Sequence, residues 1–93
     1  MSARRRYPLG QVVATPGALN TFTDAEEEYL PYLIRHACGD WGMVSPEDAR
    51  ANDEALRDGE RLLSAYRLPS GTKIWIITEA DRSSTCILLP DEY

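Results

Sequence analysis

The chain contains little cysteine and histidine, and it has no long run of apolar residues. Its 93 residues include only two cysteines and one histidine. A zinc site needs three or four ligands in recognisable spacing, so we expect neither a metal site nor a cofactor. A membrane-spanning helix needs about 20 apolar residues in succession, and no segment of the sequence approaches that length. We therefore expect no membrane span.

The N-terminus is basic but does not continue as an export signal. Residues 4–6 are three arginines, and residues 7–11 contain proline, glycine and glutamine where a signal peptide would have its apolar stretch. This pattern predicts a cytoplasmic protein whose residues 1–7 form a flexible tail. Because disulfides are rare in that compartment, Cys38 and Cys86 are expected to be free, buried thiols.

Acidic residues outnumber basic ones, fifteen to ten, which gives a net charge of −5. A protein that grips the backbone of nucleic acid usually carries a basic excess, so direct nucleic-acid binding is not favoured. The balance favours a protein partner with a basic surface, and it leaves the oligomeric state open. The residues expected to form the acidic face are Asp24, Glu26, Glu27, Glu28, Glu47 and Asp48.

The pattern of turns and apolar residues predicts one α+β domain over residues 1–93, with elements in the order β-α-α-β-β-β. Residues 9–15 alternate weakly, and Pro16-Gly17 is typical of a turn that ends a first strand. A capping box at residues 23–26 predicts the start of the first helix, and Gly39 predicts its end. Pro31 lies inside that helical pattern, so the helix should either kink or begin there.

The second half of the sequence predicts a helix followed by three strands. Ser45 and Pro46 are typical of a helix start, and this helix should run to Gly59. Residues 61–68, 73–78 and 84–89 should form an antiparallel meander that the two helices cover on one face. The strand at 73–78 should be central because it is the most continuously apolar and β-branched.

A polar corner at residues 78–85 joins the last two strands and allows two interpretations. Asp81, Ser83 and the other hydroxyls can bond neighbouring backbone groups, which would make the corner a structural loop. Alternatively, Arg82 binds an anion there. Metal-independent RNA cleavage needs a base, a proton donor and a cation, and the candidates for these roles are His36, Glu79, Arg82 and Tyr93.

Two glycines enclose Asp40 and Trp41, which predicts a tight corner with a fixed tryptophan. Trp41 either fills the core between the helices or offers a flat anchor to a partner. His36 is expected at the end of a helix, where the helix dipole favours its charged form. The candidate binding residues are therefore Asp40, Trp41, Asp81, Arg82, Ser83, Glu26, Glu27 and Glu28.

Several segments together resemble an uncharacterised family of short bacterial proteins that travel with plasmids and other mobile elements. Members are sometimes loosely labelled as related to restriction systems. The resemblance lies in residues 8–19, 39–42, 63–66, 73–82 and 88–93. Members generally have no assigned activity. We expect an accessory factor or inhibitor that acts by binding a host defence or nucleic-acid-processing complex. The order of a helical histidine, a meander with arginine and a late tyrosine is also similar to the barnase–colicin–RelE class of ribonucleases, which is the alternative function.

Overall fold

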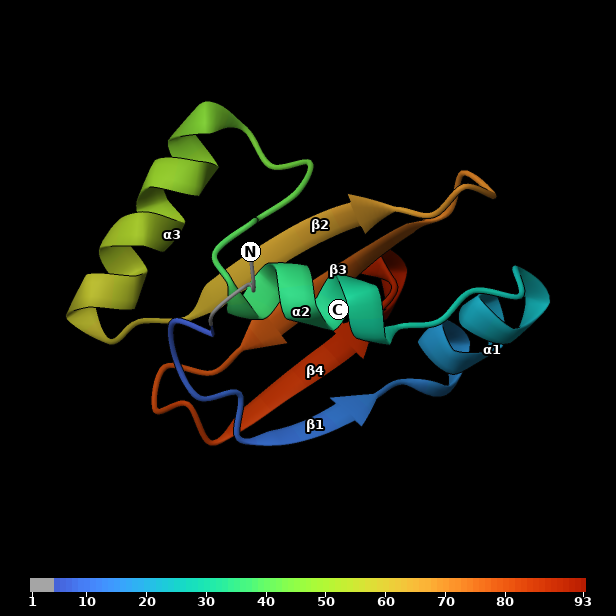
Figure 1. The fold of residues 1–93 in the computed structure, drawn as a ribbon, viewed down its shortest axis with the longest axis horizontal. Helices are drawn as coiled ribbons and strands as arrows, with labels where there is room; N and C mark the ends of the chain where they lie inside the picture. Colours follow the sequence, from blue (N-terminus) through green and yellow to red (C-terminus); the bar gives the residue numbers. More distant parts are fainter. Residues whose placement is uncertain (1–4) are drawn as a thin grey trace.

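The computed structural model describes residues 5–93 as an α+β fold, the predicted class (Figure 1). Three α-helices precede the last three strands of a four-stranded sheet, and a short 3₁₀ turn ends the chain. The elements are β1 (Gln11–Ala14), α1 (Pro16–Asp24), α2 (Leu30–Ala37), α3 (Pro46–Asp58), β2 (Leu62–Arg67), β3 (Lys73–Thr78), β4 (Ser84–Leu88) and η1 (Pro90–Glu92).

The sheet has the strand order β1-β4-β3-β2. Strands β2, β3 and β4 form the predicted antiparallel meander, and β3 is an interior strand. Strand β1 pairs in parallel with β4, with Gln11 opposite Ser84. The sheet is therefore mixed and not antiparallel throughout. A weak alternating pattern shows that a strand forms, but it does not show which distant strand it will join.

The prediction of two helices was wrong, because the chain has a third at α1. Pro16 does not form a turn but occupies the start of this helix, where proline is well tolerated. The side chain of Thr15 caps it by accepting a bond from the Ala18 amide. The supposed capping box at residues 23–26 instead ends α1, and α2 begins at Leu30 with Pro31 in its first turn.

The predicted bounds of α3 are confirmed by its caps. The hydroxyl oxygen of Ser45 accepts a bond of 3.0 Å from the Asp48 amide, which is otherwise unpaired at a helix start. Gly59 ends the helix in the left-handed region, at φ 73°.

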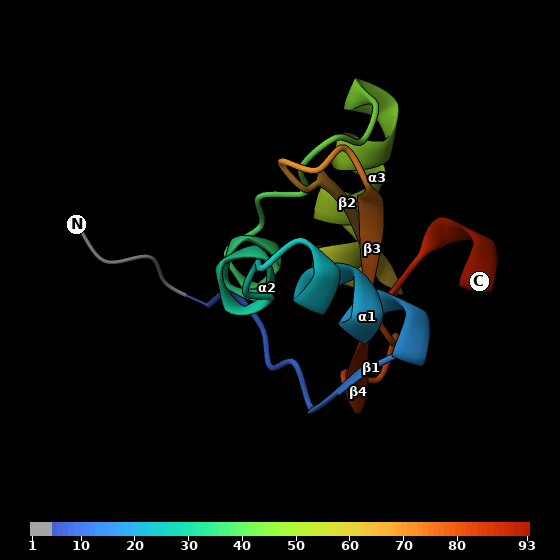
Figure 2. The same cartoon turned by 90° about the vertical axis from the view of Figure 1, so that its right-hand side faces the viewer.

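Helix α2 packs on one face of the sheet and the C-terminal turn lies on the other side (Figure 2), while α1 lies at the ends of the strands (Figure 1). The core beneath the helices is formed by Ala18, Phe22, Leu33, Tyr66, Leu68, Ile74, Ile76 and Ile87. Helix α3 lies beside β2, at one edge of the sheet (Figure 1). No helix among residues 5–93 is long and apolar enough to cross a membrane.

The prediction of a flexible tail over residues 1–7 was wrong for Arg6 and Tyr7. The first four of these residues lie outside the described part of the chain. The Arg6 amide donates a bond of 2.8 Å to the carbonyl oxygen of Ala37. The Tyr7 ring is buried, and its hydroxyl donates to the His36 carbonyl oxygen. The chain is therefore anchored to α2 from Arg6 onwards.

Candidate protein-binding surface

His36, the first of the catalytic candidates, lies inside the protein with no exposed surface. Its ring is bonded on both sides, Nδ1 to the Ser64 hydroxyl and Nε2 to the Thr78 hydroxyl. Burial without a charged partner lowers the pKa of His36 from 6.5 to about 4. The helix dipole would favour the charged imidazolium. The expectation that His36 is placed at the helix end because the dipole favours its charged form was therefore wrong. Hydroxyl groups on the sheet hold it as a neutral ring.

The hydroxyl chain beyond His36 determines which ring nitrogen carries the proton. Thr85 donates its only hydroxyl hydrogen to the carbonyl oxygen of Leu9, over 2.7 Å. The bond between Thr78 and Thr85 therefore takes its hydrogen from Thr78. The Thr78 oxygen must then accept from Nε2 of His36, over 2.8 Å. His36 is thus the Nε2–H tautomer, and Nδ1 accepts from Ser64.

The guanidinium group of Arg82 bonds four backbone carbonyl groups through its two terminal nitrogens. Nη1 donates to the carbonyl oxygens of Glu60, Glu79 and Ala80, and Nη2 donates to that of Ala55. Arg82 itself has a left-handed backbone, at φ 61°. Its charge therefore ties the corner between β3 and β4 to the end of α3, and it supports the structural interpretation of this corner.

We predict that Arg82→Lys destabilises the fold. The ammonium group of lysine cannot replace the planar guanidinium group of Arg82, whose two terminal nitrogens bond carbonyl oxygens on separate segments. The free energy of unfolding should fall by about 1–3 kcal/mol. Thermal unfolding followed by circular dichroism measures this, and Arg67→Lys on the exposed part of β2 is the matched control. Equal stability of the two variants would contradict the role of Arg82.

The remaining residues of the polar corner also serve the backbone or lie apart from His36. The Asp81 carboxylate accepts a bond of 3.0 Å from the Ser83 amide, and this lowers the pKa of Asp81 together with the bond from the Ser83 side chain. The carboxylate of Glu79 lies 3.6 Å from Arg61 Nη2, and Arg61 also donates to the Tyr93 hydroxyl. The four catalytic candidates therefore do not line one cleft.

Asp40 and Trp41 are also held in place by their neighbours. Asp40 forms an ion pair of 2.7 Å with Arg35, and this hydrogen bond lowers the pKa of the Asp40 carboxyl. Trp41 is only 5% exposed, and its indole N–H donates to Asp53. Trp41 is thus a core residue and offers no flat anchor to a partner. Among residues 5–93, no group of three or more potential ligands is placed to hold a metal ion.

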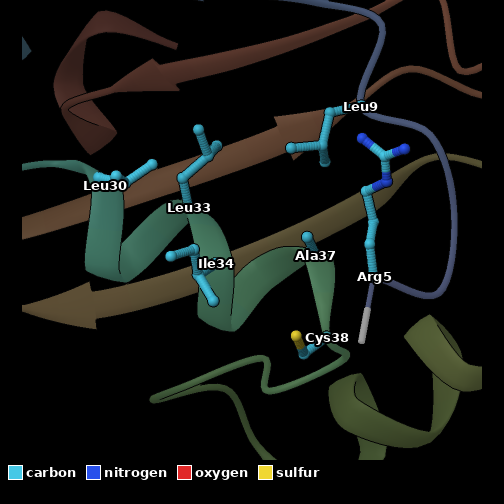
Figure 3. A pocket seen from close by; sticks show the side chains of 7 residues that line it. All are labelled: Arg5, Leu9, Leu30, Leu33, Ile34, Ala37 and Cys38. Carbon is cyan, nitrogen blue, oxygen red and sulfur yellow. The ribbon is translucent and has the colours of Figure 1, made fainter. Parts of the chain in front are cut away.

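The surface that remains open is apolar and lies along α2. A hollow of about 330 Å³ lies between α2 and the N-terminal segment. Figure 3 shows the side chains of Leu9 and Leu33 reaching into this space, with the Arg5 side chain beside Leu9. On α2, Leu30 is 51% exposed and Ile34 is 47% exposed. Cys38 lines the end of the hollow, and it is a free thiol, as expected.

The surface continues from α2 towards the acidic loop between α1 and α2. Leu30 also lines a second hollow, which Glu27 and Glu28 border together with Leu19 and Tyr29. Two of the acidic residues predicted to bind a partner are therefore placed next to exposed apolar side chains. We define the α2 surface as Leu30, Ile34, Arg5, Glu27 and Glu28.

The sequence contained a signal for the α2 surface that its helical spacing alone did not reveal. Apolar residues come in adjacent pairs, Tyr29 with Leu30 and Leu33 with Ile34. Neighbouring residues on a helix point about 100° apart, so a helix that packs on the core along one narrow stripe can leave one member of such a pair exposed. Leu33 is buried and Ile34 is exposed. An apolar stripe wider than the core requires is the sign of a binding face.

Comparison with known proteins adds little to what the structure shows about function. No family model matches the chain, and no solved structure matches it. The chain is similar to the DNA mismatch repair protein MutS 1 of two strains of Halobacterium salinarum, with 37% identity over 49 residues. That stretch is 53% of this chain and 6% of the length of each of these curated relatives.

Proposed function

We propose that this chain is a small acidic intracellular protein that acts by binding a protein partner through the α2 surface. The exposed apolar hollow along α2 carries the proposal. Leu30 and Ile34 are each about half exposed on a helix whose other face is already packed. Exposed apolar side chains that gather in a hollow mark interaction sites, and the hollow of about 330 Å³ has room for a large apolar side chain of a partner.

The acidic loop next to α2 defines the chemistry of the partner. Glu27 and Glu28 border the second hollow, and with Glu26 they have no ion-pair partner among residues 5–93. A partner segment that places an apolar anchor in the hollow and lysine or arginine beside these carboxylates would satisfy both features. Such charge complementarity raises the association rate and rejects acidic partners.

The resemblance to proteins of mobile elements supports a role as an accessory factor or inhibitor. Its partner would belong to a host defence or nucleic-acid-processing complex. The similarity to a DNA mismatch repair protein is compatible with this class of partner. The metal-independent ribonuclease has less support, because His36 is buried and the Arg82 guanidinium is bonded to carbonyl groups.

The proposal is tested by affinity purification from a native host with matched variants. Ile34→Asp places a charge in the hollow, and Met43→Asp changes an apolar side chain of similar exposure outside it. A protein captured by wild type is then purified, and its binding is measured by calorimetry. We expect Ile34→Asp to weaken this binding at least about tenfold, and Met43→Asp to leave it unchanged.

The acidic residues are tested with the same purified pair. Replacing Glu27 and Glu28 by glutamine should weaken binding several-fold at low salt and have less effect at high salt, because salt screens exposed charges. A partner that binds the Ile34→Asp variant as tightly as wild type would overturn the proposal. So would the absence of any specific partner at both salt concentrations.

A further inference from the structure

The two edges of the sheet differ in how far their backbone hydrogen-bonding groups are satisfied. At the β2 edge, the Asn52 side chain bonds both the amide and the carbonyl of Leu63. The amide of Ala65 donates to the carbonyl of Trp41, and its carbonyl accepts from the amide of Met43. Leu63 and Ala65 therefore have their outward-facing backbone groups satisfied within the chain, which hinders the pairing of another strand at this edge.

The β1 edge has no such cover. On the side that faces β4, the amide of Gln11 donates to the carbonyl oxygen of Ser83, and the amide of Thr15 donates to that of Ile87. The backbone N–H and C=O groups of successive residues face opposite sides of a strand. Those of Val12 and Ala14 therefore face away from β4. No described strand pairs with β1 on that side, and Figure 1 shows β1 as the outer strand opposite α3. Its unpaired groups form a template for another strand.

The β1 edge is also uncharged and apolar. In a chain with 27% charged residues, residues 7–23 contain none, and this segment includes all of β1 and nearly all of α1. Val12 and Val13 are each about 40% exposed, and a hollow of about 210 Å³ lies beside them. Leu19 and Tyr29 complete that hollow and are themselves nearly half exposed. Charged side chains or proline, which usually protect an edge, are missing from β1.

We propose that β1 pairs antiparallel with β1 of a second copy, so that the two sheets become continuous across a two-fold axis. A second copy brings no like charges together at this edge, although each chain carries a net charge of −5. A basic partner, in contrast, would gain nothing from the uncharged residues 7–23. A two-fold axis also covers the exposed valines of each copy with those of the other. This inference does not depend on the α2 surface.

Sedimentation equilibrium over a range of concentrations tests the pairing. Because the interface is small, we expect wild type to pass from 10.4 kDa to twice that mass with a dissociation constant of about 1 µM to 1 mM. Val13→Lys places like charges opposite each other and should raise this constant at least about tenfold. Met43→Lys, the same change at an exposed site away from β1, should dimerise like wild type.

Hydrogen exchange of the β1 amides provides a second measurement that needs no variant. The amides of Val12 and Ala14 should exchange more slowly as the wild-type concentration rises, while exposed amides elsewhere keep their rates. A protein that stays monomeric at about 1 mM would overturn the proposal. Dimerisation that leaves the β1 amides unprotected would do the same, as would protection that arises only when a different protein is added.

Discussion

Replacing Gly42 by alanine should cause a large loss of stability. Gly42 has a left-handed backbone, at φ 75°, and forms a bridge to Ala65. A Cβ atom there would overlap the Ala65 carbonyl oxygen and lie 2.6 Å from the Tyr66 ring. The backbone strain and the overlap add, so the free energy of unfolding should fall by about 2–5 kcal/mol.

Gly59→Ala separates these two causes. Gly59 has nearly the same φ, 73°, but no atom lies within 4 Å of the position of an added Cβ. Only the conformational cost of about 1–2 kcal/mol should remain. Chemical denaturation of both variants measures the difference. Equal losses would show that the approach of residue 42 to β2 is looser than described. For a domain of this size, each kcal/mol corresponds to about 4–8 °C in the melting temperature.

Stability should fall as the pH is lowered through the range where free histidine titrates. The pKa of His36 is about 4 in the folded protein and 6.5 in the unfolded chain. Between these values the unfolded state binds a proton that the folded state does not, so acid favours unfolding. From about pH 7 to about pH 5, the free energy of unfolding should fall by about 2 kcal/mol from this group alone.

The variant His36→Gln tests the source of this pH dependence. Glutamine keeps polar atoms near Ser64 and Thr78 but does not titrate, so most of the slope above about pH 5 should disappear. The pKa values of Asp40 and Glu92 are lowered from 3.8 and 4.5 by hydrogen bonds. The contribution of these two carboxyl groups to stability is present above their unfolded-state pKa values, and it is lost only when the pH falls below them. A slope unchanged in the variant would contradict the assignment to His36.

Local chemistry in the sequence predicted much of the fold. The cap at Ser45 and the stop at Gly59 located α3, and the β-branched run at 73–78 located an interior strand. The structure of the N-terminal third was harder to predict from the sequence. Pro16-Gly17 is compatible with a turn or with a helix start, and only packing of Ala18 and Phe22 on the sheet decides for the helix.

The candidate site was harder to predict, because the most reactive residue types serve the fold. His36, Arg82 and Trp41 attract attention in a sequence for the chemistry they can perform. Each is instead bonded to groups far away in the chain, which no local pattern reveals. Glu28 does lie on the exposed surface expected of it, and Glu27 is half-buried there. The sequence does not show that the apolar residues beside them are exposed, because helical spacing does not show where a core ends.

The parallel pairing of β1 with β4 has a consequence for the order in which the protein folds. Strand β1 is the first element among residues 5–93, and within this part of the chain it pairs only with β4, the last strand. The carboxylate of Glu92 reinforces this junction by accepting bonds from Thr15 and Gly17. Closing so long a loop is slow, so the meander can assemble early while β1 must wait. Until then, β1 is an uncharged strand with no partner strand, and this interval is when the chain is most exposed to misassembly.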